Sequence, residues 1–211
     1  MDTMRWQASL LDGPAMGTAV AWPPSPAALC REHLGDGAWV DHAPRWLPGA
    51  DEWFDRVVHA MEWRQRRERL HGQEFDQPRL TDHRHVDDLA GGLTPLREVA
   101  DVLSHHYGVR FERLGSNLYR DGRDSVAWHG DRIARDRDVA VIAILSLGEP
   151  RRFRLRPRDG GSGRGFDLGH GDLLVMGGTC QRTWRHAVPK VVRAGPRISL
   201  TFRHAYPPAT P

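Results

Sequence analysis

The chain has 211 residues, 39% of them hydrophobic and 27% charged, and a formal net charge of +3 at pH 7, which suits one soluble globular domain or two small ones. No apolar stretch is long enough to cross a bilayer, and the N-terminus lacks the basic start and apolar run of a secretory signal. Only Cys30 and Cys180 are present, which excludes a disulfide framework and leads us to expect a cytoplasmic protein.

The first half of the chain is expected to contain two helices separated by irregular structure. Residues 1–35 form a Pro-rich segment that we expect to be weakly structured, because three of the four residues 23–26 are proline. A short strand and a turn are expected within residues 37–47. Residues 64–93 are polar and show no clear periodicity, so we expect them to be irregular.

Two segments show the periodicity of amphipathic helices. The first covers residues 50–63, with Asp51 as its N-cap and an inner face of Phe54, Val57, Val58 and Met61. The second covers residues 94–108, where Thr94 is expected to cap the helix, Pro95 fits the first turn and Gly108 ends it. Its inner face is expected to consist of Leu96, Val99, Leu103 and Tyr107.

After Gly108 the sequence changes to short β-like runs separated by Gly, Pro or Asp. Their number and spacing favour an antiparallel sandwich or jelly roll over a fold of alternating strands and helices. The segment PRDGGSGRG is expected to connect two of these strands as a flexible hairpin. The runs are LGSNLYR, SVAWHGD, VAVIAILSL, RRFRLRP, GFDLGH, DLLVMGG, TWRHAV and RISLTFR.

A histidine and an aspartate stand two residues apart in SVAWHGD. On a strand, residues i and i+2 face the same side, about 6–7 Å apart at the backbone, so His129 and Asp131 can be two ligands of one ion. A site of two histidines and one carboxylate, typical of Fe(II), needs another ligand from a distant strand, and His186 in TWRHAV is the best candidate. Because the chain has 12 histidines, a chance pairing is the alternative interpretation.

The last run, RISLTFR, carries two arginines on one strand face. Alternation places Arg197, Ser199, Thr201 and Arg203 together, opposite a core face of apolar residues. Inside a closed barrel, two such arginines need anions, because a buried unpaired charge costs several kcal/mol. The pair would suit a small dicarboxylate; the alternative is the solvated face of an edge strand.

Several motifs together resemble the AlkB-type Fe(II)/2-oxoglutarate dioxygenases in order and spacing: NLYRDGRDSVAWHGD, ILSLG with RRFRLRP, LGHGDLLVMGG with QRTWRHAVPK, and PRISLTFR. The likeness runs from about residue 37 to residue 203 and includes QPRLT in the N-terminal part. It implies a mainly β (α+β) fold, a double-stranded β-helix or jelly roll with buttressing helices. Residues 111–206 would be the jelly-roll catalytic core. Residues 36–110, with helices and a substrate-recognition segment, would form one compact domain with that core.

The resemblance also implies the cofactors and the residues that bind them. Fe(II) would be held by His129, Asp131 and His186, and 2-oxoglutarate and O2 would fill its open positions. The expected 2-oxoglutarate contacts are the carboxylate-binding Arg197 and Arg203 and the hydrogen-bonding Asn117, Tyr119 and Ser199. Ser199 stands where many family members have Asn, and its side chain reaches less far.

The substrate residues depart from the family pattern. Many repair members carry an acidic residue two positions after the metal-binding aspartate, where this chain has Ile133. Arg79 in QPRLT matches a family arginine near that acid, and Asp136 or Asp138 could stand in for the acid itself. The departure puts the usual substrates, 1-methyladenine and 3-methylcytosine, in doubt.

The implied activity is oxidative dealkylation of bases in DNA or RNA, a repair reaction that releases formaldehyde, succinate and CO2. The basic charge balance and the alternating arginines of RRFRLRPR favour a nucleic-acid partner. Ile133 favours the alternative of a same-fold oxygenase that hydroxylates a small molecule or a protein side chain. A non-catalytic nucleic-acid-binding module is a third alternative. We expect a monomer with no membrane association and no obligate protein partner.

Overall fold

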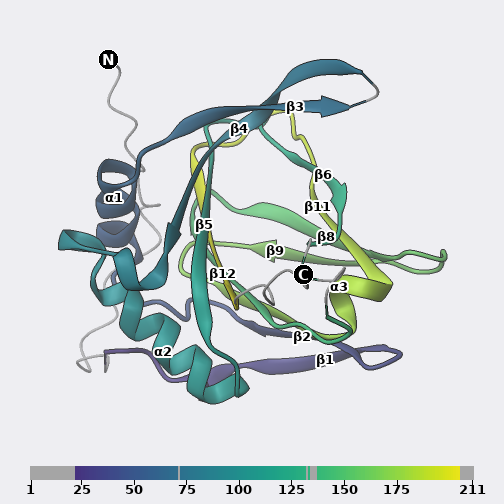
Figure 1. Cartoon of the computed structure of the whole chain (residues 1–211), viewed down its shortest axis with the longest axis horizontal. Coiled ribbons are helices and arrows are strands. Elements are labelled where there is room, and N and C mark those ends of the chain that lie inside the picture. Colours follow the sequence, from purple (N-terminus) through teal and green to yellow (C-terminus); the bar gives the residue numbers. More distant parts are fainter. Residues whose placement is uncertain (1–21, 71, 132, 134–136, 205–211) are drawn as a thin grey trace, which may run out of the picture.

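The computed structural model describes residues 22–70, 72–131, 133 and 137–204, and the statements below refer to these residues. Most of the Pro-rich segment (1–21) and Asp136 lie outside the described residues. The chain forms two antiparallel β-sheets with helices against one outer face (Figure 1). The eight-stranded sheet has the order β1-β2-β10-β7-β12-β5-β4-β3, and the four-stranded sheet has the order β6-β11-β8-β9.

The bounds of these elements confirm the mainly β prediction and its jelly-roll class. Each of the strands expected after Gly108 is present, and PRDGGSGRG contains the connection between β8 and β9. The large sheet consists of Cys30–Gly35 (β1), Ala38–Ala43 (β2), Arg64–Leu70 (β3), Gln73–His85 (β4), Phe111–Tyr119 (β5), Ile142–Gly148 (β7), Leu173–Gly178 (β10) and Arg197–His204 (β12). The small sheet consists of Val126–His129 (β6), Arg151–Pro157 (β8), Arg164–Leu168 (β9) and Trp184–Val188 (β11). The helices are Ala50–Ala60 (α1), Pro95–Tyr107 (α2) and Cys180–Thr183 (α3), with short 3-10 turns at Pro26–Ala28, Val86–Asp88 and Gly91–Leu93.

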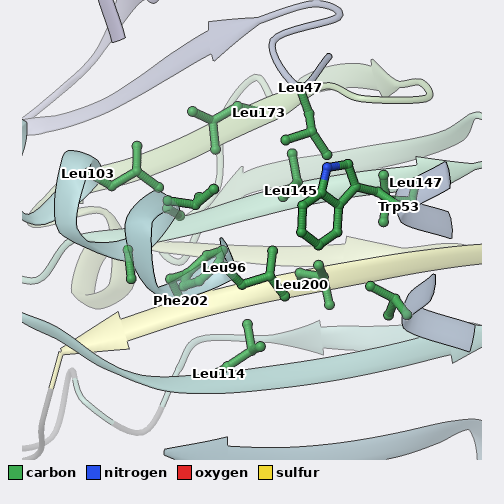
Figure 2. Packing of buried hydrophobic residues seen from close by; sticks show 14 of the residues in the cluster. Leu47, Trp53, Leu96, Leu103, Leu114, Leu145, Leu147, Leu173, Leu200 and Phe202 are labelled. Carbon is green, nitrogen blue, oxygen red and sulfur yellow. The ribbon is translucent and has the colours of Figure 1, made fainter. Parts of the chain in front are cut away.

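The two long helices cover the outer face of the large sheet, as the buttressing-helix prediction requires (Figure 1). Leu96 and Leu103 of α2 pack in one cluster with Leu114, Leu200 and Phe202 of the sheet (Figure 2). The three apolar residues of RISLTFR are fully buried in this cluster, so the predicted core face of β12 is confirmed. Its opposite face is therefore turned toward the small sheet.

The ends of the helices differ in part from the prediction. Helix α1 is preceded by Gly49 in the left-handed conformation (φ 64°), and Asp51 lies in its first turn instead of at the N-cap. A glycine can adopt this conformation without steric cost, and Asp51 still interacts favourably with the helix dipole. Thr94 precedes α2 without a side-chain capping bond, whereas Gly108 ends it in the left-handed conformation as expected.

The expectation that residues 64–93 are irregular is wrong. Strands β3 and β4 form a long hairpin, and β4 also pairs with β5 (Figure 1). The pairing of β3 with β4 shifts register between Gln65 and Arg67, close to Pro78, and the Gln65 side-chain amide donates to the carbonyl oxygens of Gln77 and Arg79. A polar edge hairpin with a bulge lacks the regular apolar alternation by which strands are predicted.

The N-terminal boundary at residue 35 also needs correction. Strand β1, expected to be weakly structured, pairs with β2 at the edge of the large sheet. Strand β2 in turn pairs with β10, so early and late parts of the chain alternate within one sheet. We propose that residues from 30 onward fold as one unit with the C-terminal strands.

A second apolar cluster fills part of the space between the two sheets. It includes Ile142 and Met176 of the large sheet and Leu155 and Trp184 of the small sheet, together with Ile133. In the rest of the space between them, the two sheets enclose a pocket. None of the described helices combines the length and the apolar character that a bilayer crossing requires.

Candidate active site

The pocket between the sheets has a volume of about 370 Å³. Strands β4, β5 and β12 of the large sheet line it together with β6, β8 and β11 of the small sheet. Nearly all the site residues expected from the sequence line it: His129, Asp131, His186, Asn117, Tyr119, Arg197, Ser199, Arg203 and Arg79. Ile133 is the exception.

The two histidines lie side by side because β6 and β11 are neighbours in the small sheet. His129 pairs directly with His186 in the register, and their ring centroids are 4.2 Å apart. His186 is 6% exposed and stacks on Phe153, with a centroid separation of 5.4 Å. Burial, reinforced by His129, lowers the pKa of His186 to about 3. His186 is therefore neutral at pH 7 and keeps a lone pair for a metal.

Asp131 is held by contacts from two directions. Its Oδ1 accepts a hydrogen bond from Arg203 Nε at 2.9 Å and forms an ion pair with Nη2 of the same guanidinium at 2.9 Å. Its backbone N–H donates to Gln181 Oε1 at 3.0 Å. Its Oδ2 is buried with no hydrogen-bond partner among the described residues, 3.8 Å from His186 Nε2. Burial alone would raise the pKa of Asp131, but Arg203 and the histidines outweigh burial and lower that pKa. The carboxylate is therefore ionised.

Two imidazoles and an ionised carboxylate are a donor set that divalent iron accepts. The buried, unpartnered Oδ2 of Asp131 fits a metal that would supply its missing partner. His129 Nδ1 lies 2.9 Å from the carbonyl oxygen of Ala127, which leaves Nε2 as the nitrogen available to a metal. No group of three ligating side chains is arranged as a ready metal cluster in the described part of the chain. A bound metal would therefore draw these donors closer together.

Arg197 is the most deeply buried charge in the pocket, with 1% exposure. Its Nε donates to Ser146 Oγ at 3.0 Å, and its guanidinium carbon lies 5.1 Å from the centroid of the Tyr119 ring. Its Nη1 has no hydrogen-bond partner within the described residues, and burial lowers its pKa. A guanidinium held in this way is prepared for an anion, and a carboxylate is the natural partner.

A chain of hydrogen bonds links the remaining polar residues of the pocket. Arg79 Nε donates to Asn117 Oδ1 at 2.9 Å, and Asn117 Nδ2 donates to Ser199 Oγ at 3.2 Å. The register of β5 and β12 explains this arrangement, because Asn117 pairs with Ser199 and Tyr119 pairs with Arg197. The face of β5 with Asn117 and Tyr119 was predicted from i, i+2 spacing, as was the face of β12 with Arg197 and Ser199. The two faces thus lie side by side on neighbouring strands.

Of the two substitutes proposed for the missing acid, Asp136 lies outside the described residues and Asp138 does not reach the pocket. Ile133 is fully buried in the apolar cluster between the sheets. Asp138 forms an exposed ion pair with Arg182 and does not line the pocket. Asp131 is thus the only acidic side chain that lines the pocket among the described residues.

Sequence reasoning missed Ser146 and Gln181. Ser146 pairs with Ser199 in the register of β7 and β12, which brings it to Arg197. Gln181 is 2% exposed on the short helix α3, between β10 and β11. Ser146 stands in ILSLG and Gln181 in QRTWRHAVPK, but their residue types and spacing indicate no role, and only the strand order brings them to the site.

Replacing Gln181 with methionine is expected to weaken metal binding by about 10- to 100-fold, since it removes the acceptor that fixes the Asp131 backbone. Titration calorimetry with Co(II) measures this change. Arg182→Ala, on the same helix but exposed, is the matched control and should bind the metal as the wild type does. Equal affinities of all three proteins would contradict the role of Gln181.

The chain is similar to proteins of one enzyme family. A model of the 2OG-Fe(II) oxygenase superfamily matches residues 42–203. The alpha-ketoglutarate-dependent dioxygenase alkB homolog 3 of Bos taurus is 33% identical over 203 residues, covering 87% of this chain and 69% of that protein. The DNA oxidative demethylase ALKBH2 of Arabidopsis thaliana is 32% identical over 232 residues, covering 88% of this chain and 73% of that protein.

Solved structures support the fold. An oxidoreductase of the 2OG-Fe(II) oxygenase family from Burkholderia pseudomallei superposes with a TM-score of 0.56 at 19% identity, covering 80% of this chain and 85% of that one. A prolyl hydroxylase from Trichoplax adhaerens gives a TM-score of 0.59 at 12% identity, covering 79% and 83%. This protein therefore belongs to the 2OG-Fe(II) oxygenase superfamily and is an AlkB-like dioxygenase, with Fe(II), 2-oxoglutarate and O2 as its cofactors.

Proposed function

We propose that this protein removes alkyl groups from base nitrogens of DNA or RNA by oxidation. The observation that carries the proposal is the pocket in which two histidines and Asp131 lie together with the buried, charge-unpaired Arg197. In the balanced reaction, an N–CH3 group, O2 and 2-oxoglutarate give N–H, formaldehyde, succinate and CO2. The name of the plant relative, a DNA oxidative demethylase, supports the substrate class.

We assign metal binding to His129, Asp131 and His186. Fe(II), when bound, supplies the site at which O2 is activated. The chain's own contribution is to keep His186 neutral and Asp131 ionised, and to orient Asp131 through Gln181. Phe153, stacked on His186, contributes an apolar wall that limits access of water.

We assign 2-oxoglutarate binding to the face of β12 and its neighbour β5. Arg197 would pair with one carboxylate of the cofactor through its free Nη1. Arg203, already bound to Asp131, would lie near the metal end of the cofactor. Asn117, Tyr119 and Ser199 complete this wall of the pocket and would orient the cofactor.

The outer face of the small sheet supports a nucleic-acid substrate. Arg152, Arg154, Arg156 and Arg158 are exposed, and the guanidinium carbon of Arg156 lies 4.3 Å from the Trp128 ring centroid. A Cβ atom on Gly130 would lie 2.8 Å from Arg158 Nη2, so the arginine row ends beside the loop between the two metal ligands. Such a row can follow phosphates next to a flipped base.

A same-fold oxygenase acting on a small molecule or a protein side chain is the second candidate. It is favoured by the lining of the pocket, in which Asp131 is the sole carboxylate among the described residues. A cationic methylated base would then lack the acidic partner that many repair members provide. Succinate formation without demethylation would support this second candidate.

The test is mass spectrometry of a single-stranded DNA oligomer that carries one 3-methylcytosine, incubated with the protein, Fe(II), 2-oxoglutarate and O2. We expect loss of the methyl group that depends on 2-oxoglutarate and is absent with His129→Ala. A parallel RNA oligomer separates the two nucleic acids. If neither oligomer loses its methyl group while succinate forms, the nucleic-acid assignment is wrong.

A further inference from the structure

The four buried polar atoms of the pocket that lack a hydrogen-bond partner among the described residues are Gln77 Oε1, Thr81 Oγ1, Asp131 Oδ2 and Arg197 Nη1. A buried polar atom without a partner is costly, so such an atom in the wall of a binding pocket is a candidate contact for a ligand. The proposed function accounts for two of these atoms, because a metal would take the Asp131 oxygen and a cofactor carboxylate would take the Arg197 nitrogen. Gln77 and Thr81 remain, and both belong to β4.

Strand β4 presents one continuous wall to the pocket. Gln77, Arg79, Thr81 and His83 alternate along the strand, and all four line the pocket. Arg79 is occupied, since it donates to Asn117 Oδ1 and to the carbonyl oxygen of Ser125. Gln77 and Thr81, at 6% and 3% exposure, are therefore the buried groups of this wall that are available to a substrate.

The orientation of the Gln77 amide is fixed from outside the pocket. Its Nε2 donates to a carboxylate oxygen of Glu68 on β3. A carboxylate only accepts hydrogen bonds, so the reversed amide would set two acceptors against each other. Gln77 therefore offers the pocket an acceptor, whereas the Thr81 hydroxyl can either donate or accept.

We propose that Gln77 Oε1 accepts a hydrogen bond from the exocyclic amino group of the substrate base, and that Glu68 is the positioning residue that holds the amide in this orientation. The inference rests on the proposed function, because it requires a nucleobase in the pocket. Adenine and cytosine carry such an amino group, whereas thymine has a carbonyl oxygen in the corresponding place. Gln77 thus selects amino-bearing bases against methylated thymine.

The experiment compares two single-stranded DNA oligomers that differ only in the lesion, 3-methylcytosine or 3-methylthymine. The measured quantity is the ratio of their kcat/KM values for demethylation, together with the ratio of their dissociation constants for the metal-free protein by fluorescence anisotropy. Gln77→Met keeps the side-chain volume and removes the acceptor. We expect it to lower both cytosine-to-thymine preferences about tenfold or more. Comparing each variant with the wild type cancels the preference that arises from the charge of the lesion.

Glu68→Ala tests the positioning role without changing the pocket wall. It frees the amide to turn and donate to the thymine carbonyl, so we expect the preference to fall through increased activity on 3-methylthymine. A residue that merely stabilised the hairpin would not produce this gain. Glu74→Ala removes the same charge from the same hairpin and should keep the wild-type preference, since Glu74 is opposite Arg69 in the register.

Substrate-independent consumption of 2-oxoglutarate, measured for every variant, establishes that the cofactor site is intact. If the wild type neither binds nor demethylates either oligomer, the proposed function fails and this inference fails with it. If the wild type is active and Gln77→Met leaves the preference unchanged, only the role of Gln77 is overturned. Equal preferences in Glu68→Ala and Glu74→Ala would overturn the role of Glu68.

Discussion

Replacing His186 with alanine is expected to lower 2-oxoglutarate turnover by more than about 100-fold. Removing a residue that only orients a metal ligand typically costs about 10- to 100-fold, and loss of the ligand itself should cost more. His186 is the buried histidine of the pocket and the one nearest to the unpartnered Asp131 oxygen. The variant loses its stacking on Phe153 and its tilted ring contact with His129, a cost of roughly 1–3 kcal/mol that a domain of ordinary stability tolerates. A succinate assay measures turnover, and thermal unfolding with and without Co(II) measures metal binding.

His204→Ala provides the matched control. His204 is also buried, on β12, but its Nε2 accepts from the backbone N–H of Val141 at 3.1 Å and it does not line the pocket. This variant should lose about 1–3 kcal/mol of stability and keep both its turnover per folded molecule and its Co(II)-dependent rise in Tm. Wild-type turnover in His186→Ala would remove His186 from the metal site.

The strands after Gly108 were predictable because each satisfies a local rule. In RISLTFR and RRFRLRP, apolar and polar residues alternate, and glycines or prolines mark the ends of the runs. The alternation and the end signals therefore indicate the same strands. The β3–β4 hairpin follows no such rule. Its strands are polar at the edge of the sheet, and the bulge near Pro78 breaks the alternation. Its pairing with β5 depends on residues far away in the sequence, which no local pattern contains.

The same distinction applies to the site. The i, i+2 pairs His129 with Asp131 and Asn117 with Tyr119 were visible because one strand face defines them. The contact of Asp131 with Arg203 and the support from Gln181 depend on how β12 and α3 lie against residues 129–131. The unpartnered oxygen of Gln77 depends on a glutamate of the neighbouring strand. Residue type and spacing therefore predict which side chains are candidate ligands, whereas only the three-dimensional structure reveals the groups that orient them.

Arg197→Met is expected to weaken 2-oxoglutarate binding roughly 100-fold, because loss of a buried charged hydrogen-bond partner costs about 3 kcal/mol. Without the cofactor, the variant should be at least as stable as the wild type, since methionine replaces a buried guanidinium whose contacts, Ser146 and the Tyr119 ring, carry no negative charge. The wild type should gain Tm when 2-oxoglutarate is added, and the variant should not. Calorimetric titration with 2-oxoglutarate and thermal unfolding measure the two effects.

A second buried arginine, Arg151, provides the matched control for this prediction. Arg151 is 2% exposed, and its guanidinium carbon also lies near the Tyr119 ring, 5.7 Å from the centroid. Its guanidinium, however, donates to the carbonyl oxygens of Asp121, Asp124 and Pro189. Arg151→Met would leave these acceptors unpaired, so it should lower stability while 2-oxoglutarate affinity stays close to that of the wild type. Arg197→Met is thus expected to lower 2-oxoglutarate affinity without lowering stability, whereas Arg151→Met is expected to lower stability without lowering that affinity. If Arg197→Met instead destabilised the protein and left cofactor affinity unchanged, Arg197 would be a structural residue and the cofactor carboxylate would bind elsewhere.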